Sequence, residues 1–160
     1  MRQTGTSRWQ KFWHLPSHEK GLLLRASILF AVTGVCLRVA GFRKSKRLLE
    51  RLDSSASRPA TSSRDEGIAA AARVTQIVSV AERWSFNKPT CLERSLVLWQ
   101  MLRHQHLPAQ LHIGARKNEH VLEAHAWVEC SGVVLNDTAD VHKHYSRFDG
   151  PIADEEAETR

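Results

Sequence analysis

The sequence predicts an α+β domain in which a helix that begins with a cysteine packs on a small antiparallel sheet, behind an N-terminal helical region. Three observations predict this class. Apolar segments with helical spacing precede residue 85, a helix-start signal stands at Thr90 and Cys91, and residues 109–137 alternate between polar and apolar side chains. With 160 residues and 42 % hydrophobic content, the chain can bury the core of one globular domain.

Composition divides the chain into three parts. Residues 1–64 form a basic helical region that ends in a Ser/Pro-rich linker, residues 65–150 form the core, and residues 151–160 form an acidic tail that we expect to be frayed. The first part holds 13 basic and 3 acidic residues, whereas residues 65–160 hold 10 and 14. The basic part would attract an acidic partner or a membrane surface, but no nucleic-acid-binding motif accompanies it.

The N-terminal region is dominated by one apolar helix over residues 17–50. Its uninterrupted stretch between Arg25 and Arg38 is twelve residues long, short of the roughly 20 that a bilayer span requires. We interpret it as a core helix with a solvated basic end. Contact with an anionic lipid surface stays open as the alternative, because a basic cluster follows directly. That cluster consists of Arg43, Lys44, Lys46 and Arg47.

The cysteine count and the first residues indicate a cytoplasmic protein. Three cysteines do not make a disulfide framework, and an odd number is typical of a reducing compartment. Residues 1–16 are basic and aromatic and lack the apolar core and cleavage site of a signal peptide. We expect them to pack on the protein's own domain.

A capping box defines the helix that begins at Cys91. Thr90 is the N-cap and Glu93 the third helical residue, while Pro89 stands just outside the helix. Free N–H groups and the positive end of the helix dipole surround Cys91, and both favour a nucleophilic thiolate. An ordinary cysteine at a helix start is the alternative. A helix over residues 65–84 precedes this one.

Three strands follow the helix, and the loop between the last two decides the chemistry. Residues 109–115 form the first strand, and residues 122–130 and 133–137 form a hairpin around Ser131-Gly132. A two-residue loop would pair Cys130 with Val133 and put His125 and Asp137 on opposite faces.

A three-residue loop would instead pair Glu129 with Val133 and put His125 opposite Asp137. There the carboxylate could orient the imidazole. We predict the three-residue loop. The alternative for His125 is a strand histidine with one satisfied hydrogen bond.

Several of these segments together resemble the leader peptidases of lasso-peptide biosynthesis, which are transglutaminase-like cysteine proteases. The segments are Cys91-Leu92-Glu93-Arg94-Ser95, Leu107-Pro108-Ala109, Ile113-Gly114, His125-Ala126-Trp127-Val128-Glu129 and Leu135-Asn136-Asp137. The resemblance implies a papain-like triad on an α+β core, with Cys91 as nucleophile, His125 as general base and acid, and Asp137 as orienting carboxylate. Asp140 ranks second for the third position, since it lies beyond the predicted pairing.

The resemblance also implies a substrate and partners. The substrate would be a ribosomally made lasso-peptide precursor whose leader is removed before an ATP-dependent cyclase closes the ring. The N-terminal half is typical of an apolar helix and not of the small winged domain that recognises the leader, so we expect a separate leader-recognition protein. The triad requires no metal, nucleotide or other cofactor. Candidates for substrate or oxyanion contact, beside the Cys91 N–H, are Asn87, Thr90 and Trp127.

Two other function classes stay open. The same triad and thioester would serve another acyl-transfer enzyme, such as a transglutaminase or amidase. The chain could also be a non-catalytic docking module of the maturation complex. A zinc site is disfavoured, because the pairs His104 with His106 and His142 with His144 lack the spacing of a structural site.

Overall fold

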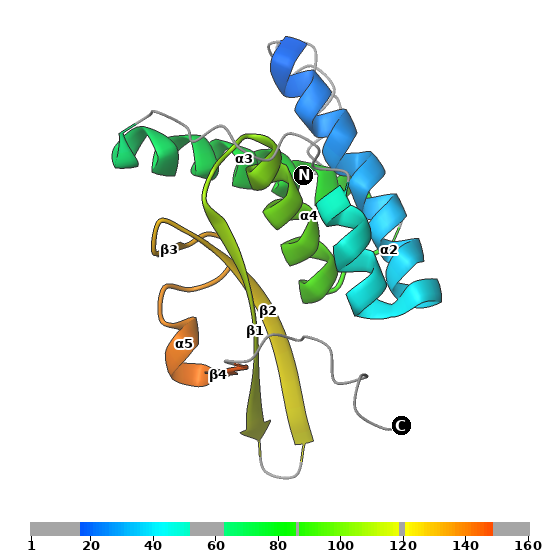
Figure 1. The fold of residues 1–160 in the computed structure, drawn as a ribbon, viewed down its shortest axis with the longest axis vertical. Coiled ribbons are helices and arrows are strands. Elements are labelled where there is room, and N and C mark those ends of the chain that lie inside the picture. Colours follow the sequence, from blue (N-terminus) through cyan, green and yellow to red (C-terminus); the bar gives the residue numbers. More distant parts are fainter. Residues whose placement is uncertain (1–16, 52–62, 86, 119–120, 149–160) are drawn as a thin grey trace, which may run out of the picture.

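The computed structural model describes residues 17–51, 63–85, 87–118 and 121–148 (Figure 1). Residues 1–16, almost all of the predicted linker and the predicted acidic tail lie outside the described residues. The division into three parts stays a prediction. The elements in chain order are α2 (Ser17–Arg51), α3 (Arg64–Trp84), α4 (Cys91–His104), β1 (Ala109–Asn118), β2 (Val121–Cys130), β3 (Val133–Val134), α5 (Val141–His144) and β4 (Ser146–Arg147).

The predicted helices are confirmed, and each has a local cause. α2 contains a kink at Gly41, whose φ of 74° is readily adopted only by glycine. Beyond the kink the chain turns back, and Leu49 is buried in the core. α3 begins behind a second capping box, in which Ser63 and Glu66 each bond the backbone N–H of the other. The last turn of α4 ends at His104, so Pro108 lies outside the helix.

The three long helices share one core, into which β2 packs from the other side. α2 and α3 cross over α4, and the β1–β2 ladder extends away from the helices (Figure 1). The largest fully buried core side chains come from α2 to α4 and β2, and include Leu49, Val78, Leu96, Leu98, Met101, Leu102 and Val128. The hydrophobic effect therefore fixes α4 between the other helices and the sheet.

The sheet has four antiparallel strands in the order β3-β2-β1-β4. Val128 and Cys130 of β2 face the helical core, whereas Trp127 faces α5 on the opposite side. Gly114 of β1 lies beneath the Trp127 ring and beside the Ser146 carbonyl of β4. A Cβ at residue 114 would stand 3.1 Å from the ring and 2.9 Å from that oxygen, so the close approach requires glycine.

The hairpin between β2 and β3 corrects one prediction. Its loop has two residues rather than three, and Cys130 pairs with Val133. Ser131 and Gly132 have φ values of 52° and 83°, as a two-residue turn with positive φ at both positions requires. β3 ends at Val134, so the third strand is shorter than the predicted 133–137.

The segment after the hairpin is more ordered than the sequence indicated. The sequence predicted no helix or strand beyond residue 137, but α5 and β4 occupy residues 141–147. Val141 is buried, and the Arg147 guanidinium donates to the Glu129 carboxylate of β2. Tertiary contacts rather than local propensity stabilise these short elements.

Candidate active site

Cys91 is the first residue of α4, as predicted. The Thr90 hydroxyl accepts from the Glu93 N–H at 3.2 Å, and the Thr90 N–H donates to the Glu93 carboxylate at 2.6 Å. The N-terminus of α4 is therefore rigidly defined, and the Cys91 side chain is half-buried there. The Glu93 and Arg94 N–H groups are bonded to Thr90, which leaves the N–H groups of Cys91 and Leu92 to donate to a developing oxyanion.

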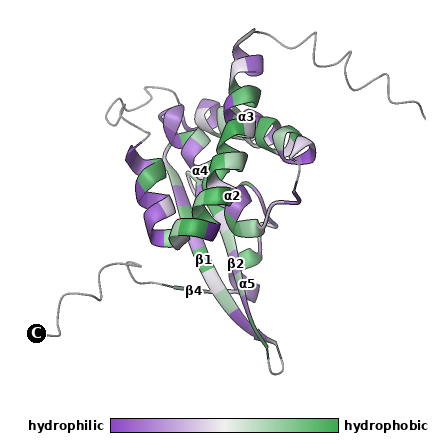
Figure 2. Ribbon diagram, turned by 90° about the vertical axis from the view of Figure 1, so that its right-hand side faces the viewer, coloured by the Kyte–Doolittle hydropathy of each residue, from purple (hydrophilic) through white to green (hydrophobic). Residues whose placement is uncertain are grey.

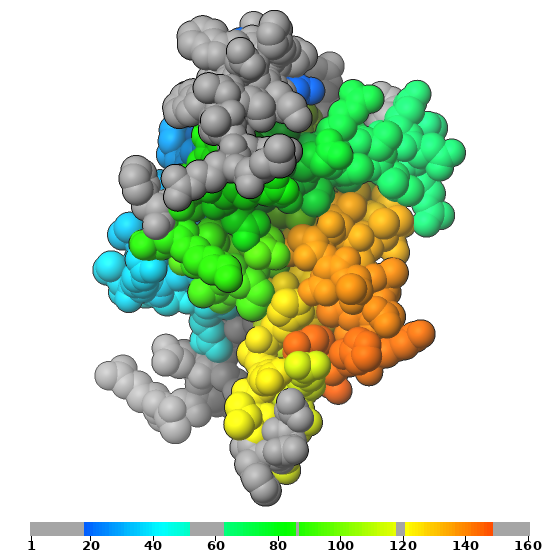
Figure 3. Space-filling view, turned by 180° about the vertical axis from the view of Figure 1, so that it is seen from behind, coloured from blue at the N-terminus to red at the C-terminus, as the bar shows by residue number. Residues whose placement is uncertain are grey.

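Hydrogen bonds of the Ser95 side chain join α4 to β2 and to the segment after β3. The buried Ser95 hydroxyl donates to the Ala126 carbonyl at 2.8 Å and accepts from the Asn136 amide at 2.8 Å. Residues four apart lie on the same face of a helix, so Cys91 lies one turn before Ser95 on the side that faces β2. Figure 3 shows atoms of α4 (green), β2 (yellow) and the segment from β3 to α5 (orange) adjoining one another on one face.

The residues that follow Leu92 in the first turns of α4 also have structural tasks. Arg94 donates two hydrogen bonds to Glu82 of α3, at 2.6 and 3.1 Å. Glu93 caps the helix, and Ser95 joins it to β2. Three successive side chains after Leu92 thus attach the cysteine-bearing turn to its own backbone, to α3 and to the sheet.

A hydrogen bond joins Nε2 of His125 to Oδ2 of Asp137. The predicted pairing exists, although the predicted register does not. The Leu135 N–H still donates to the Val128 carbonyl at 3.0 Å, but the Val128 N–H donates to the Asn136 side chain at 2.8 Å instead of to a backbone carbonyl. This change of acceptor brings Asp137 to His125 in spite of the two-residue loop.

The carboxylate of Asp137 is held ionised. Burial alone would raise the pKa of Asp137, but hydrogen bonds from His125 and from the Thr138 N–H, at 2.7 Å, outweigh it and lower the pKa below its ordinary value. An ionised carboxylate requires a proton on Nε2 of His125. Nδ1 is then the ring atom that can accept a proton from a thiol.

A family model described as the transglutaminase-like superfamily matches residues 31–148. The chain belongs to the transglutaminase-like superfamily. No curated protein and no solved structure matches it. The predicted α+β fold class is confirmed by this membership and by the helices packed on a four-stranded antiparallel sheet. The superfamily includes cysteine proteases and acyltransferases, so the match supports the general chemistry and not one substrate.

The second-ranked acid lies elsewhere in this transglutaminase-like domain. Asp140 pairs with His144 at 3.5 Å, and both side chains are at least half exposed. Asp137, which bonds His125, is the better candidate for the third position. Among the described residues, no group of three or more His, Cys, Asp or Glu side chains could hold a metal ion.

The structure separates the three candidates for substrate or oxyanion contact. Trp127 is fully buried and its indole N–H donates to Glu129 at 2.9 Å, so it is not available as an oxyanion donor. Asn87 is exposed and lines a cavity of about 330 Å³ between α2, α3 and the start of α4. The Thr90 hydroxyl is used as a helix cap, but its own proton is free to donate.

Two aromatic side chains, Trp127 and Tyr145, contact the His125 ring. The Trp127 ring stacks on His125 with a centroid distance of 6.4 Å and an interplanar angle of 21°. The Tyr145 ring, at the end of α5, lies 4.9 Å from the imidazole on centroids. Trp127 is a positioning residue through this contact. Tyr145, Ser95 and Asn136 were missed as contributors; a polar residue directly after a strand was the available signal for Asn136.

Proposed function

We propose that this chain is a cysteine peptidase that removes the leader from a lasso-peptide precursor. The observation that carries the proposal is the His125–Asp137 pair beside a helix that begins with Cys91. The superfamily match supports thiol-based acyl chemistry. The choice of substrate rests on the resemblance of the Cys-Leu-Glu-Arg-Ser segment to lasso leader peptidases.

The proposed route for hydrolysis uses Cys91, His125 and Asp137 in turn. Nδ1 of His125 takes the Cys91 proton, and the thiolate adds to the carbonyl at the end of the leader. The resulting oxyanion is bound by N–H groups of the first turn of α4, with the Thr90 hydroxyl as a second donor. The C–N bond breaks as His125 protonates the leaving amine of the core peptide. His125 then deprotonates a water, which cleaves the thioester and returns the thiolate.

The proposal includes a partner and a place. The described N-terminal region consists of helices α2 and α3, which pack into the protein's own core. We infer that a separate leader-recognition protein delivers the precursor. The peptidase would act in the cytoplasm and pass the free core peptide to the ATP-dependent cyclase.

Mass spectrometry of the precursor tests the proposal. The full chain, its leader-recognition partner and the precursor are mixed, and the wild type is compared with Cys91→Ala and with Cys36→Ser as a matched cysteine control. We expect one cut in the wild type and in Cys36→Ser, and none in Cys91→Ala. A folded wild type that leaves the precursor intact would refute the peptidase function.

The same assay separates the two alternatives. Addition of a primary amine during the reaction reveals acyl transfer, because the product then carries the mass of the amine instead of water. Full lasso-peptide production in cells that carry only Cys91→Ala would instead identify a docking module. Either result would replace the proposal.

A further inference from the structure

The helix α2 presents a continuous apolar stripe to solvent. Leu24, Ile28, Val35 and Val39 are 64 %, 54 %, 59 % and 82 % exposed, and Ala31 is exposed between them. Their spacings of four, three, four and four residues place all five on one side of the helix. We call these five residues the outer stripe of α2. Figure 2 looks onto this side of the molecule and shows hydrophobic residues along the helix.

The hydrophobic core of the protein does not account for the outer stripe, because the stripe lies on the solvent side of α2. Leu29 and Phe30 on the inner side of α2 are buried with α3 and α4, so the helix already has a packed face. By length and composition, the helix His18–Arg51 would qualify as a membrane span, because its most apolar 18-residue window has a mean hydropathy of 1.9, yet only 33 % of that window is buried. A core helix of such composition would be mostly buried. Because the inner face is occupied, α2 is suited to lie along a membrane rather than to cross it.

Between its acidic residues Glu19 and Glu50, α2 carries charge of one sign only. From Lys20 to Leu49 the chain has seven basic residues and no acidic one. Arg38 is exposed beside Val35 and Val39, and the exposed Arg43 and Lys44 directly follow the kink at the end of the stripe. Apolar surface bordered by basic residues without acids is the pattern of a helix that binds anionic lipid.

We propose that the outer stripe of α2 and its basic border dock the protein on the anionic surface of a lipid bilayer. A second copy of the chain is a poor occupant, because two such faces would bring like charges together. Residues 1–16 carry three basic and no acidic residues, so the same repulsion applies to them. Residues 149–160 are acidic but offer Ile152 as their single large apolar side chain.

Vesicle co-sedimentation of the full chain tests the proposal. Vesicles of phosphatidylcholine alone are compared with vesicles that also contain phosphatidylglycerol. We expect binding to the second kind only, weakened by added salt because surface charges are screened. The triple variant Arg38→Gln, Arg43→Gln, Lys44→Gln should lower the partition coefficient by about fivefold for each charge, or about a hundredfold together.

Apolar variants complete the test. The triple variant Leu24→Gln, Ile28→Gln, Val35→Gln should abolish sedimentation with vesicles. The matched control is the double variant Val121→Gln, Leu122→Gln at the far end of the β1–β2 ladder, where Val121 is 61 % and Leu122 is 72 % exposed. This variant should bind vesicles like the wild type. Circular dichroism checks that each variant is folded.

Three results would overturn the proposal. These are absence of binding to anionic vesicles, equal loss of binding in the control variant, and a wild-type dimer in light scattering that the stripe variant converts to a monomer. The proposal does not depend on catalysis, so Cys91→Ala should bind vesicles like the wild type whether or not the peptidase function holds.

Discussion

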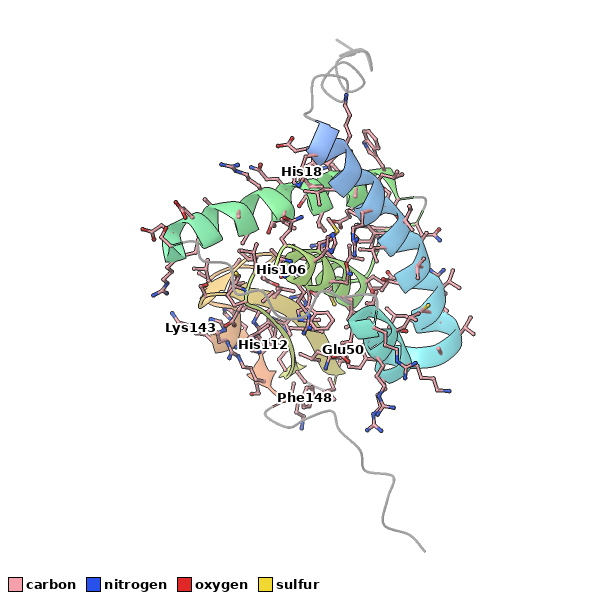
Figure 4. The ribbon with its side chains drawn as sticks, turned by 45° about the horizontal axis from the view of Figure 1, so that its top comes forward. His18, Glu50, His106, His112, Lys143 and Phe148 are labelled. Atoms are coloured by element: carbon pink, nitrogen blue, oxygen red, sulfur yellow. The ribbon has the colours of Figure 1, made fainter. Side chains whose placement is uncertain are left out.

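The sheet side of this molecule and the outer stripe of α2 depend on different kinds of interaction. Figure 4 shows His112 and Lys143 on the side of the sheet and α5, and Glu50, at the end of α2, on the other side. On the sheet side, Asp137, Asn136 and Ser95 each have a defined hydrogen-bond partner. The outer stripe of α2 consists of interchangeable aliphatic groups. One substitution on the sheet side should therefore cause a large loss of activity or stability, because it removes a specific hydrogen bond. One substitution on the outer stripe should have a small effect, because the stripe acts through its total apolar area and charge.

The largest effect is expected at His125. His125→Ala should lower the rate of leader cleavage by at least about 1,000-fold, because both proton transfers depend on this ring. The measurement is single-turnover cleavage by mass spectrometry. His144→Ala is the matched control, since His144 is an exposed histidine that pairs with Asp140 instead. Comparable losses in both variants would show that the loss at His125 is not specific to the site.

The next effect concerns the choice between two carboxylates. Asp137→Asn should lower the cleavage rate by about 100-fold or more, because the amide no longer stabilises the imidazolium or fixes its tautomer. Asp140→Asn should keep nearly the wild-type rate, since Asp140 does not contact His125. The same assay measures both. If the order of the two variants were reversed, the assignment of the third triad position would be wrong.

Ser95 tests how firmly α4 is held to the sheet. Ser95→Ala leaves the Ala126 carbonyl and the Asn136 amide without this buried partner, so unfolding free energy should fall by about 1–3 kcal/mol in urea titration. Ser27→Ala is the control, because the Ser27 hydroxyl bonds only the carbonyl of Leu23 in its own helix. Ser27→Ala should lower the unfolding free energy by less than Ser95→Ala does. Equal losses would mean that the link between α4 and β2 adds no stability.

Acid should weaken the sheet side through Asp137. The pKa of Asp137 is lower in the folded state than its ordinary value of 3.8, since the hydrogen bonds from His125 and Thr138 outweigh burial. The group therefore stabilises the fold above about pH 4, and this contribution is lost as pH falls through the folded pKa. Unfolding free energy measured by urea titration from neutral pH to about pH 3 should fall more steeply in the wild type than in Asp137→Asn. If the unfolding free energies of the wild type and Asp137→Asn fell in parallel with pH, Asp137 would not be the group that makes the fold sensitive to acid.

The smallest effect is expected on the outer stripe. Val39→Gln should change the unfolding free energy by no more than about 0.5 kcal/mol, because Val39 is 82 % exposed and makes no core contact. Thermal unfolding of the full chain measures it. A large loss of stability would show that the stripe belongs to the fold, and the contrast between the two sides would disappear.

The sequence was sufficient where the cause of structure is local. The capping box of Thr90 and Glu93 needs only four consecutive residues, and it correctly predicted the start of α4 at Cys91. The alternation around His125 likewise predicted β2. These parts carry their own signal, because hydrogen bonds within one turn and side chains along one strand decide them.

Other parts depend on contacts that the sequence does not display. The two-residue loop requires Ser131 to adopt a positive φ, which residue propensity disfavours. The pairing of His125 with Asp137 was predicted for the wrong reason, since the Asn136 side chain, and not the ladder, brings the carboxylate into place. α5 and β4 were missed because such short elements are stabilised by Val141 and by the bond from Arg147 to Glu129.

The role of Asn136 also makes the hairpin tip suitable for engineering. In a regular ladder, one residue added at Ser131-Gly132 would move every following side chain to the opposite face. Here Asn136 anchors the chain to Val128 and Ser95 independently of the turn. The tip should therefore accept inserted sequence, such as an epitope or a fluorophore-labelling tag, without moving Asp137. The position of Asp137 and the length of the neighbouring loop can thus vary separately during evolution.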